Sequence, residues 1–251
     1  MDKMIHLSLN TLDIALRKQA VSAQNLANMN VSGYRRDMYE SFGSLYMSAD
    51  NQLNARTFAI TNGSGIFDPT QGRMRHTDMS TDMAIEGDGF FVSKKPGAAI
   101  SLTRRGDMSV SSERQLVNGA GALILNQNLQ PITVPPFRKM IVSEGGELMI
   151  EPLNGEPGVT ENLGLIGLIS AQDIQLRKDD DGEIRPENAE IQPDQNVKIK
   201  QGYVEESNVN AIDELVASMG YQRSYELNMK LIKTASDLDE NTASLLRLPN
   251  G

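Results

Sequence analysis

The 251-residue chain contains no cysteine. This absence excludes disulfide bonds, thiolate metal ligands and a cysteine nucleophile. A cysteine-free sequence suits a protein that works outside the cytosol, although cytosolic proteins can lack cysteine too. Tryptophan is also absent, and aromatic residues make up only 5% of the sequence. So few aromatic side chains disfavour a site that binds bases or sugars by stacking.

Positive charge and long apolar runs are scarce as well. Lysine and arginine number 24 against 33 aspartates and glutamates, which gives a formal net charge of -9 at pH 7. Because phosphate backbones are held by clustered Lys and Arg, nucleic acid is not expected as a partner. No run approaches the ~20 apolar residues that span a bilayer, and no positive stretch precedes an apolar one at the N-terminus. We therefore expect neither membrane insertion nor export with a cleaved signal peptide.

The sequence offers no recognisable catalytic, cofactor or metal motif. Its two histidines, His6 and His76, lack the spacing of paired zinc ligands. The stretch 87–89 lacks the flanking residues of a phosphate loop, and we interpret it as a tight turn. The acidic stretch 179–183 lacks the ligand spacing of a calcium loop, and we interpret it as a solvated turn. We predict that the protein is not an enzyme and has no cofactor, catalytic residues or metal site.

A regular stripe runs along the N-terminal segment. Its members are spaced alternately by four and three residues: Ile5, Leu9, Leu12, Leu16, Gln19, Ala23 and Leu26. This is the a/d spacing of a coiled-coil seam, and glycine and asparagine near residue 33 end it. We predict an N-terminal helix within residues 1–33 that pairs with another helix. A helix packed only on its own domain is the alternative.

The C-terminal segment has the same character. Beyond Asn210 the next proline is Pro249, and Gly220 is the only glycine before it. The large apolar residues form two patches: Ile212, Leu215, Val216 and Met219, then Leu227, Leu231 and Leu238. Asn208 or Asn210 can cap the start of a helix, and two acidic residues follow in its first turn. We predict that residues 204–251 form a helix that pairs with the N-terminal one.

The middle of the chain differs from both ends. Between about residues 73 and 203, turn residues separate short apolar runs that are typical of strands. The runs are residues 90–92, 123–125, 132–134, 140–142, 148–150 and 165–169. Residues 144–147 carry a hairpin signal, and the polar range 34–72 is interpreted as a linker. The predicted fold class is therefore α+β, with paired, coiled-coil-like terminal α-helices and an inserted all-β domain over residues 73–203.

Four stretches in the same order resemble signatures of the flagellar rod and hook protein family. Residues 24–28 and 31–36 resemble its N-terminal signature, with serine and tyrosine at positions where the family has threonine and phenylalanine. Residues 82–92 resemble its D-x-A-I-x-G-x-G-F-F-V segment. The third stretch, 102–118, is looser, since Leu102 and Met108 replace aromatic residues. Residues 206–230 resemble the C-terminal SNVN…QRxYExNxK signature.

The resemblance implies a structural subunit of the flagellar basal body. In such a rod the terminal helices line an inner layer, the β domain forms an outer one, and the packed helices transmit torque. The implied partners are copies of the chain, other rod proteins and the flagellar export apparatus, and the implied location is the periplasmic rod. Length, the Met1-Asp2 start and the compact middle most resemble proximal-rod members, with distal-rod members as the alternative. Two rival classes of protein are an enzyme acting on cell-wall polysaccharide and a binding module or assembly chaperone.

The resemblance and the helical patterns together assign roles to individual residues. The expected assembly interface consists of Ile5, Leu9, Leu12, Leu16 and Leu26 with Ile212, Leu215, Met219, Leu227 and Leu231. Packing within a single chain is the alternative for these side chains. The expected helix-end signature consists of Asn25, Asn28, Gly33, Asn208 and Asn210. We expect its asparagines to fix where the helices begin and end, as turn and cap residues.

Overall fold

The computed structural model describes residues 2–39, 43–47, 56–60, 65–172, 174–188, 190–194 and 196–246, and the side chains of these residues except those of 2–7, 43–47, 56–60 and 243–246. The chain forms two compact units. A helical unit combines Met1–Ala27, Asp37–Ser64 and Asn210–Gly251, and a β unit combines Asn28–Arg36 and Gly65–Val209. The range 34–72, expected as a linker, is thus divided between the two units.

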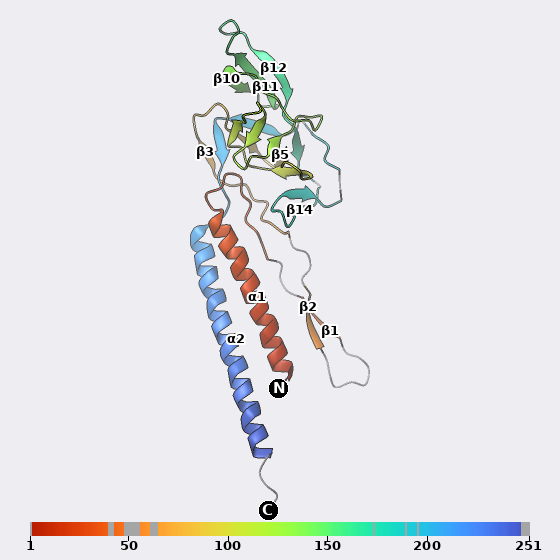
Figure 1. Ribbon diagram of the computed structural model, residues 1–251, viewed down its shortest axis with the longest axis vertical. Helices are drawn as coiled ribbons and strands as arrows, with labels where there is room; N and C mark the ends of the chain where they lie inside the picture. Colours follow the sequence, from red (N-terminus) through yellow and green to blue (C-terminus); the bar gives the residue numbers. More distant parts are fainter. Residues whose placement is uncertain are drawn as a thin grey trace, which may run out of the picture. The chain divides into compact units, whose positions relative to one another are not determined.

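The helical unit is built on two long helices that lie side by side, α1 (Asp2–Ala27) and α2 (Ala211–Leu246) (Figure 1). They run antiparallel, since Ser22 near the end of α1 contacts Glu214 near the start of α2. The expected pairing of the terminal helices is confirmed. Both helices are shorter than the predicted ranges, because α1 ends before the signature turn and α2 begins after it.

A hairpin in the range 37–64 also belongs to the helical unit. Its strands, β1 (Gly43–Met47) and β2 (Arg56–Ile60), pair antiparallel with Gly43 opposite Ile60. The interpretation of residues 34–72 as a linker did not anticipate these two strands. Tyrosine, phenylalanine, threonine and isoleucine in these two short runs favour an extended backbone.

The β unit consists of antiparallel sheets. The largest has eight strands, and β13 (Leu168–Ser170) joins it by pairing with β5. The other seven run in the order β14 (Leu176–Lys178), β15 (Ile184–Pro186), β6 (Ile100–Thr103), β5 (Gly89–Lys94), β9 (Leu123–Ile124), β8 (Leu116–Asn118) and β7 (Met108–Val110). A second sheet contains β10 (Phe137–Val142), β11 (Glu147–Pro152) and β12 (Glu161–Leu165). Two strand pairs complete the unit, β4 (Met83–Glu86) with β16 (Lys198–Gln201) and β3 (Met74–His76) with β17 (Tyr203–Glu205).

Most of the predicted apolar runs lie in these strands. The predicted turn 144–147 connects β10 to β11, and Gly146 within it has a φ of 84°. Residues 132–134 were expected as a strand, but only Thr133 forms an isolated bridge, with Gln115. Prolines at positions 131, 135 and 136 flank this run and have no N–H to donate, so a continuous ladder cannot extend through it.

The core of the β unit lies on both faces of β5. Phe91 is fully buried in one apolar cluster, together with residues of β4, β10 and β11. Phe90 and Val92 point to the opposite face and belong to a second cluster with Phe67 and Ile184. Successive side chains of a strand point to opposite faces. The uninterrupted apolar run of β5 therefore reflects a strand covered on both sides.

Candidate assembly faces and the junction of the β unit

The buried side chains between α1 and α2 are small or polar. On α1 they include Ser8, Ala15 and Ser22, which follow one another at heptad intervals. On α2 they are Glu214 and Ala235. Because a coiled-coil core normally contains large aliphatic side chains, this small seam gains less from apolar burial than a leucine seam of equal length.

The large apolar residues lie beside this seam and are exposed. Leu9 and Leu16 directly follow Ser8 and Ala15 and are 45% and 47% exposed. The five predicted residues of α2 are between 49% and 71% exposed: Ile212, Leu215, Met219, Leu227 and Leu231. We call these seven side chains the apolar faces. Leu12 and Leu26 are half-buried, and Ile5 lies in α1 with its side chain outside the described residues.

Two of the signature asparagines lie where a helix ends or begins. The Asn210 side-chain oxygen accepts a hydrogen bond from the Ile212 N–H at 3.0 Å, which is N-cap geometry at the start of α2. Beyond the end of α1, the Asn28 carbonyl accepts a hydrogen bond from the Val31 N–H at 3.0 Å in a turn. These two residues lie at the positions expected for turn and cap residues.

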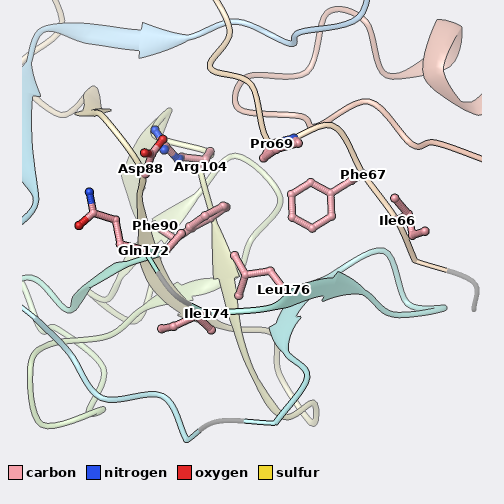
Figure 2. A pocket seen from close by; sticks show the side chains of 10 residues that line it. Ile66, Phe67, Pro69, Asp88, Phe90, Arg104, Gln172, Ile174 and Leu176 are labelled. Atoms are coloured by element: carbon pink, nitrogen blue, oxygen red, sulfur yellow. The ribbon is translucent and has the colours of Figure 1, made fainter.

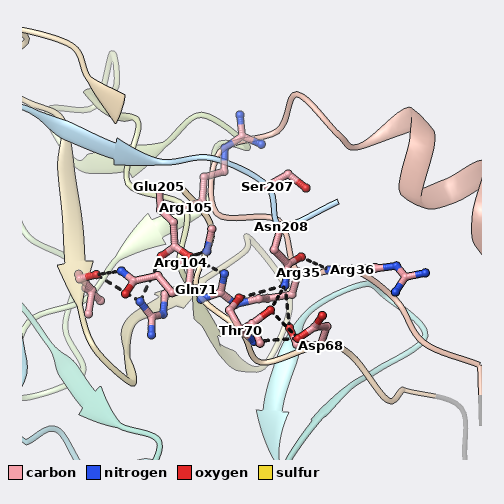
Figure 3. Close-up of polar contacts among 12 residues, drawn as sticks. Arg35, Arg36, Asp68, Thr70, Gln71, Arg104, Arg105, Glu205, Ser207 and Asn208 are labelled. Carbon is pink, nitrogen blue, oxygen red and sulfur yellow. Dashed lines mark hydrogen bonds and ion pairs between the residues drawn. The ribbon is translucent and has the colours of Figure 1, made fainter. Parts of the chain in front are cut away.

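The other two signature asparagines connect distant segments. Asn25 lies inside α1, and its amide bonds both the N–H and the carbonyl of Asp37, at 2.8 and 3.0 Å. Asn208 accepts a hydrogen bond from the Arg36 N–H at 2.7 Å and donates to the carbonyls of Asp68 and Thr70 (Figure 3). In these hydrogen bonds neither side chain caps a helix terminus. Each joins a signature segment to another part of its own unit.

Gly33 is held against the backbone of another segment of the β unit. Its φ is 66°, and a Cβ at this position would lie 2.3 Å from the carbonyl carbon of Arg104. Its N–H donates to the Glu205 carbonyl at 2.7 Å. Both the left-handed backbone and the absence of a side chain are therefore required here.

The Glu205 carboxylate lies at the centre of a buried charged cluster (Figure 3). It accepts hydrogen bonds from Arg35, from Arg104 at 3.1 Å and from the Gly72 N–H at 2.7 Å. All three charged side chains are at most 2% exposed. The cluster therefore joins the segment after α1, the segment before β3 and the end of β17 within the β unit.

Two buried guanidinium groups share this single carboxylate. Burial lowers the pKa of Arg104 to about 10, although the neighbouring Glu205 acts in the opposite direction. Arg104 also donates to the carbonyls of Ile85 and Gly87. Among the described residues, the Nε atoms of Arg35 and Arg104 and the Nη2 of Arg35 have no hydrogen-bond partner. Glu205 is thus essential to the cluster, because its loss would leave two buried charges without a counter-charge.

Sequence reasoning did not identify Arg35, Arg104 and Glu205 as a group. Each lies within or next to one of the stretches that carry the family resemblance. The missed signal was a set of charged residues in otherwise apolar or glycine-containing stretches, since such residues need a partner when they are buried. The sequence does not show which arginines meet which carboxylate, because the three lie far apart along the chain.

A pocket of about 420 Å³ lies beside this cluster (Figure 2). Its lining is mostly apolar and includes Phe67, Phe90 and Leu176, with Arg104 and Asp88 among its polar members. Asp88 is the only carboxylate among the described lining residues, whereas glycoside hydrolysis ordinarily needs two. The pocket therefore gives no support to the polysaccharide enzyme considered as a rival class.

Metal binding and membrane insertion find no support in the part of the chain that the structure describes. Within the described residues, no group of three or more His, Cys, Asp or Glu side chains is arranged to hold a metal ion. The described helices also include none that is long and apolar enough to cross a bilayer.

An antiparallel pair of terminal helices with exposed apolar faces, joined to an antiparallel β unit, defines the class of this protein as α+β. Two family models match it. The flagellar basal body rod FlgEFG C-terminal model matches residues 200–245, and the flagellar hook protein FlgE/F/G D1 domain model matches residues 84–150. The first match includes most of α2, and the second runs from β4 to β11.

Curated relatives match nearly the whole chain. The flagellar basal-body rod protein FlgG of Borreliella burgdorferi is 30% identical over 237 residues, which cover 86% of this chain and 88% of that protein. FlgF of Salmonella typhimurium is 26% identical over 253 residues, which cover 98% of both chains. FlgF of Escherichia coli is 27% identical over 246 residues, which cover 94% of this chain and 95% of that protein. The chain belongs to the flagellar basal-body rod protein family.

Proposed function

We propose that this protein is a structural subunit of the flagellar rod that assembles through the apolar faces of its terminal helices. The observation that carries this proposal is the exposure of Leu9, Leu16 and the five large apolar residues of α2 in a single chain. Burying one such side chain is worth about 1.5–3 kcal/mol, so their joint burial against neighbouring subunits can drive assembly. Exposed apolar patches of this kind mark interaction surfaces.

In this proposal the subunits form an open assembly. Copies that contact one another head to tail, without closing into a ring, generate a helical tube. The partners in this proposal are copies of the chain and other rod proteins, and the helical unit supplies the contacts between them. The predicted residues Leu12, Leu26 and Ile5 belong to the same proposed interface.

We further propose the FlgF type, the proximal rod, for this chain. The support is the near-complete coverage shared with two FlgF relatives, although FlgG relatives also cover most of the chain. The proposal includes a location in the periplasmic part of the rod, delivery by the flagellar export apparatus, and a purely structural role without catalysis. Transmission of torque follows from the packed helices.

The assembly proposal is tested with Leu227→Glu combined with Leu231→Glu. Both residues are exposed, so the single chain should fold normally, whereas two carboxylates in a subunit interface would be buried without partners. The matched control is Gln222→Glu with Thr234→Glu, which adds the same charge at exposed positions of the same helix. Basal bodies purified from cells producing each variant should contain the control and lack the Leu227/Leu231 variant. Normal incorporation of both variants would contradict the proposal.

The rod position is tested by complementation. The wild-type gene should restore swimming to a strain that lacks FlgF and should fail in a strain that lacks FlgG. The reverse result would assign the chain to the distal rod. Restoration of neither, with the protein exported and stable, would count against both assignments.

A further inference from the structure

A buried polar cluster lies where the seam of the helical unit begins. The Ser22 hydroxyl lies 2.6 Å from Oε2 of Glu214 and 2.9 Å from the Glu214 carbonyl oxygen, and it can donate to either. The Asn25 amide donates to Oε1 of the same carboxylate at 3.1 Å. All three residues are at most 2% exposed. Both carboxylate oxygens of Glu214 therefore lie within hydrogen-bond distance of donors from α1.

Asn25 extends this cluster to a third segment. The same amide that donates to Glu214 also bonds the backbone of Asp37 in both directions. A side chain that bonds a carboxylate and a peptide group at once is restricted to positions and rotamers that satisfy both groups. The cluster consequently fixes the rotation of α1 about its own axis, as well as its position along α2.

Fixing this rotation matters because each helix carries two competing stripes. On α1 the buried stripe of Ser8, Ala15 and Ser22 lies one residue from the apolar stripe of Leu9 and Leu16. One residue corresponds to a rotation of about 100°. A rotated pairing through the leucines would bury more apolar surface within the chain, and hydrophobic burial alone would favour it. That rotation would remove the Ser22 and Asn25 donors from Glu214, which would leave a buried carboxylate unsatisfied.

We infer that Ser22, Asn25 and Glu214 form a register lock that selects the small seam over the leucine seam and keeps the apolar faces outside the helix pair. A buried polar residue is known to specify register in coiled coils at some expense of stability. The lock itself is a property of the single chain. Its consequence, that the outward faces remain free for other subunits, rests on the proposed rod function.

The absence of cysteine allows a direct measurement of the rotation. Ser8 and Asn228 lie two heptads beyond Ser22 and Glu214 on their respective helices, so they should face each other across the small seam. Leu9 follows Ser8 and Leu227 precedes Asn228. These two leucines would face each other only in a rotated pairing, in which both helices have turned. We therefore propose two paired variants of the full-length chain, Ser8→Cys with Asn228→Cys and Leu9→Cys with Leu227→Cys. Each is oxidised and scored for the intramolecular disulfide by non-reducing gel electrophoresis.

In an otherwise wild-type chain, the first pair should form the disulfide at least about tenfold more than the second, because a disulfide needs closely opposed Cβ atoms. Adding Glu214→Leu should shift the ratio about tenfold or more towards the second pair. Adding Glu214→Gln should preserve the original ratio, because an amide oxygen still accepts from Ser22 or Asn25. Asp213→Leu, at the exposed neighbouring position, should also leave the ratio unchanged.

An unchanged ratio after Glu214→Leu would overturn the register lock, as would a preference for the Leu9/Leu227 pair in the wild-type background. The same variants are then scored for incorporation into basal bodies. If the disulfide ratio shifts with Glu214→Leu as expected but the wild-type chain is not incorporated into basal bodies, the rod function is refuted and the register lock stands. If the wild-type chain is incorporated but the disulfide ratio does not change with Glu214→Leu, the register lock is refuted and the rod function stands.

Discussion

The β unit and the helical unit place their large apolar side chains in opposite ways. In the β unit, Phe91 and Leu148 are fully buried, whereas Ile212 on α2 is 71% exposed. The β unit satisfies its apolar surface internally, as a domain that folds by itself does. The helical unit closes around small and polar side chains and leaves most of its large aliphatic side chains exposed. This difference indicates that apolar burial within the chain comes mainly from the β unit, and it supports the proposal that the exposed apolar side chains of the helices contact other chains.

The strongest test of this difference in apolar burial is to truncate one apolar side chain in each unit. Phe91→Ala should lower the free energy of unfolding of the β unit by about 4 kcal/mol, because it empties a fully buried core position. Leu227→Ala should change the stability of the single chain by less than about 0.5 kcal/mol, since this side chain is already in water. Urea denaturation, monitored by hydrogen exchange of peptides from each unit, measures the change in free energy of unfolding for both variants. A loss above about 2 kcal/mol for Leu227→Ala would show that α2 buries this face within the chain.

The next largest effect is expected from removing the buried carboxylate of Glu205. Glu205→Ala should destabilise the β unit by about 3 kcal/mol, because Arg35 and Arg104 would remain buried without a carboxylate. Glu206→Ala is the matched control, since its ion pair with Arg75 is exposed and worth about 1 kcal/mol or less. Equal effects of the two substitutions, measured by urea denaturation, would remove Glu205 from its central role.

Gly33 offers a backbone test of the same junction. Gly33→Ala should destabilise the β unit by about 2 kcal/mol more than Gly121→Ala. Both glycines have a positive φ, but a Cβ at position 121 would meet no atom within 4 Å, whereas one at position 33 would overlap the Arg104 backbone. The difference in thermal midpoint between the two variants isolates the close contact from the backbone strain. Equal midpoints would mean that the segment after β6 that carries Arg104 can move away.

The small seam should resist enlargement. Ala15→Leu should destabilise the helix pair by about 1–2 kcal/mol, because a larger side chain must be forced between α1 and α2. Ala20→Leu is the control, since Ala20 is exposed on the same helix. The loss of helical signal on heating, followed by circular dichroism, reports the effect. Stabilisation by Ala15→Leu would show that the seam accepts aliphatic side chains and that its smallness has no structural reason.

The smallest expected effect concerns a charged turn in the β unit. A hydrogen bond from Arg185 is the main reason why the pKa of Asp181 falls to about 2. The ordinary value is about 3.9, so this pair contributes stability above about pH 4, and the contribution disappears as the pH falls from about 4 towards about 2. Arg185→Met should therefore flatten the acid dependence of stability, with a loss of about 1 kcal/mol or less at neutral pH. Thermal melts across this acidic range would detect the change, and an unchanged slope would contradict it.

Periodicity and spacing were sufficient to predict the terminal helices, their pairing, and the strands β5, β9, β10, β11 and β13 of the β unit, but not its other strands. The stripe through Leu9 and Leu16 correctly marked a large apolar surface, but it did not reveal that the helices meet one residue away. That choice depends on Glu214, whose partners Ser22 and Asn25 lie on the other helix. The charged cluster around Glu205 escaped prediction for the same reason. Contacts between polar residues that are distant in sequence leave no periodic pattern.

The hydrogen bond from Gly33 to Glu205 also affects how the chain folds. Ser22 and Glu214 meet across 192 residues of sequence, a separation that makes unassisted closure of the helix pair entropically costly. Once the β unit has formed, Gly33 and Glu205 are held together, and only the short connections 28–32 and 206–210 separate them from the two helices. Shortening the effective loop in this way recovers about 2 kcal/mol of closure entropy. Formation of the β unit thus raises the effective concentration of each terminal helix for the other, and we expect the helices to pair faster once β17, the last strand of that unit, is in place.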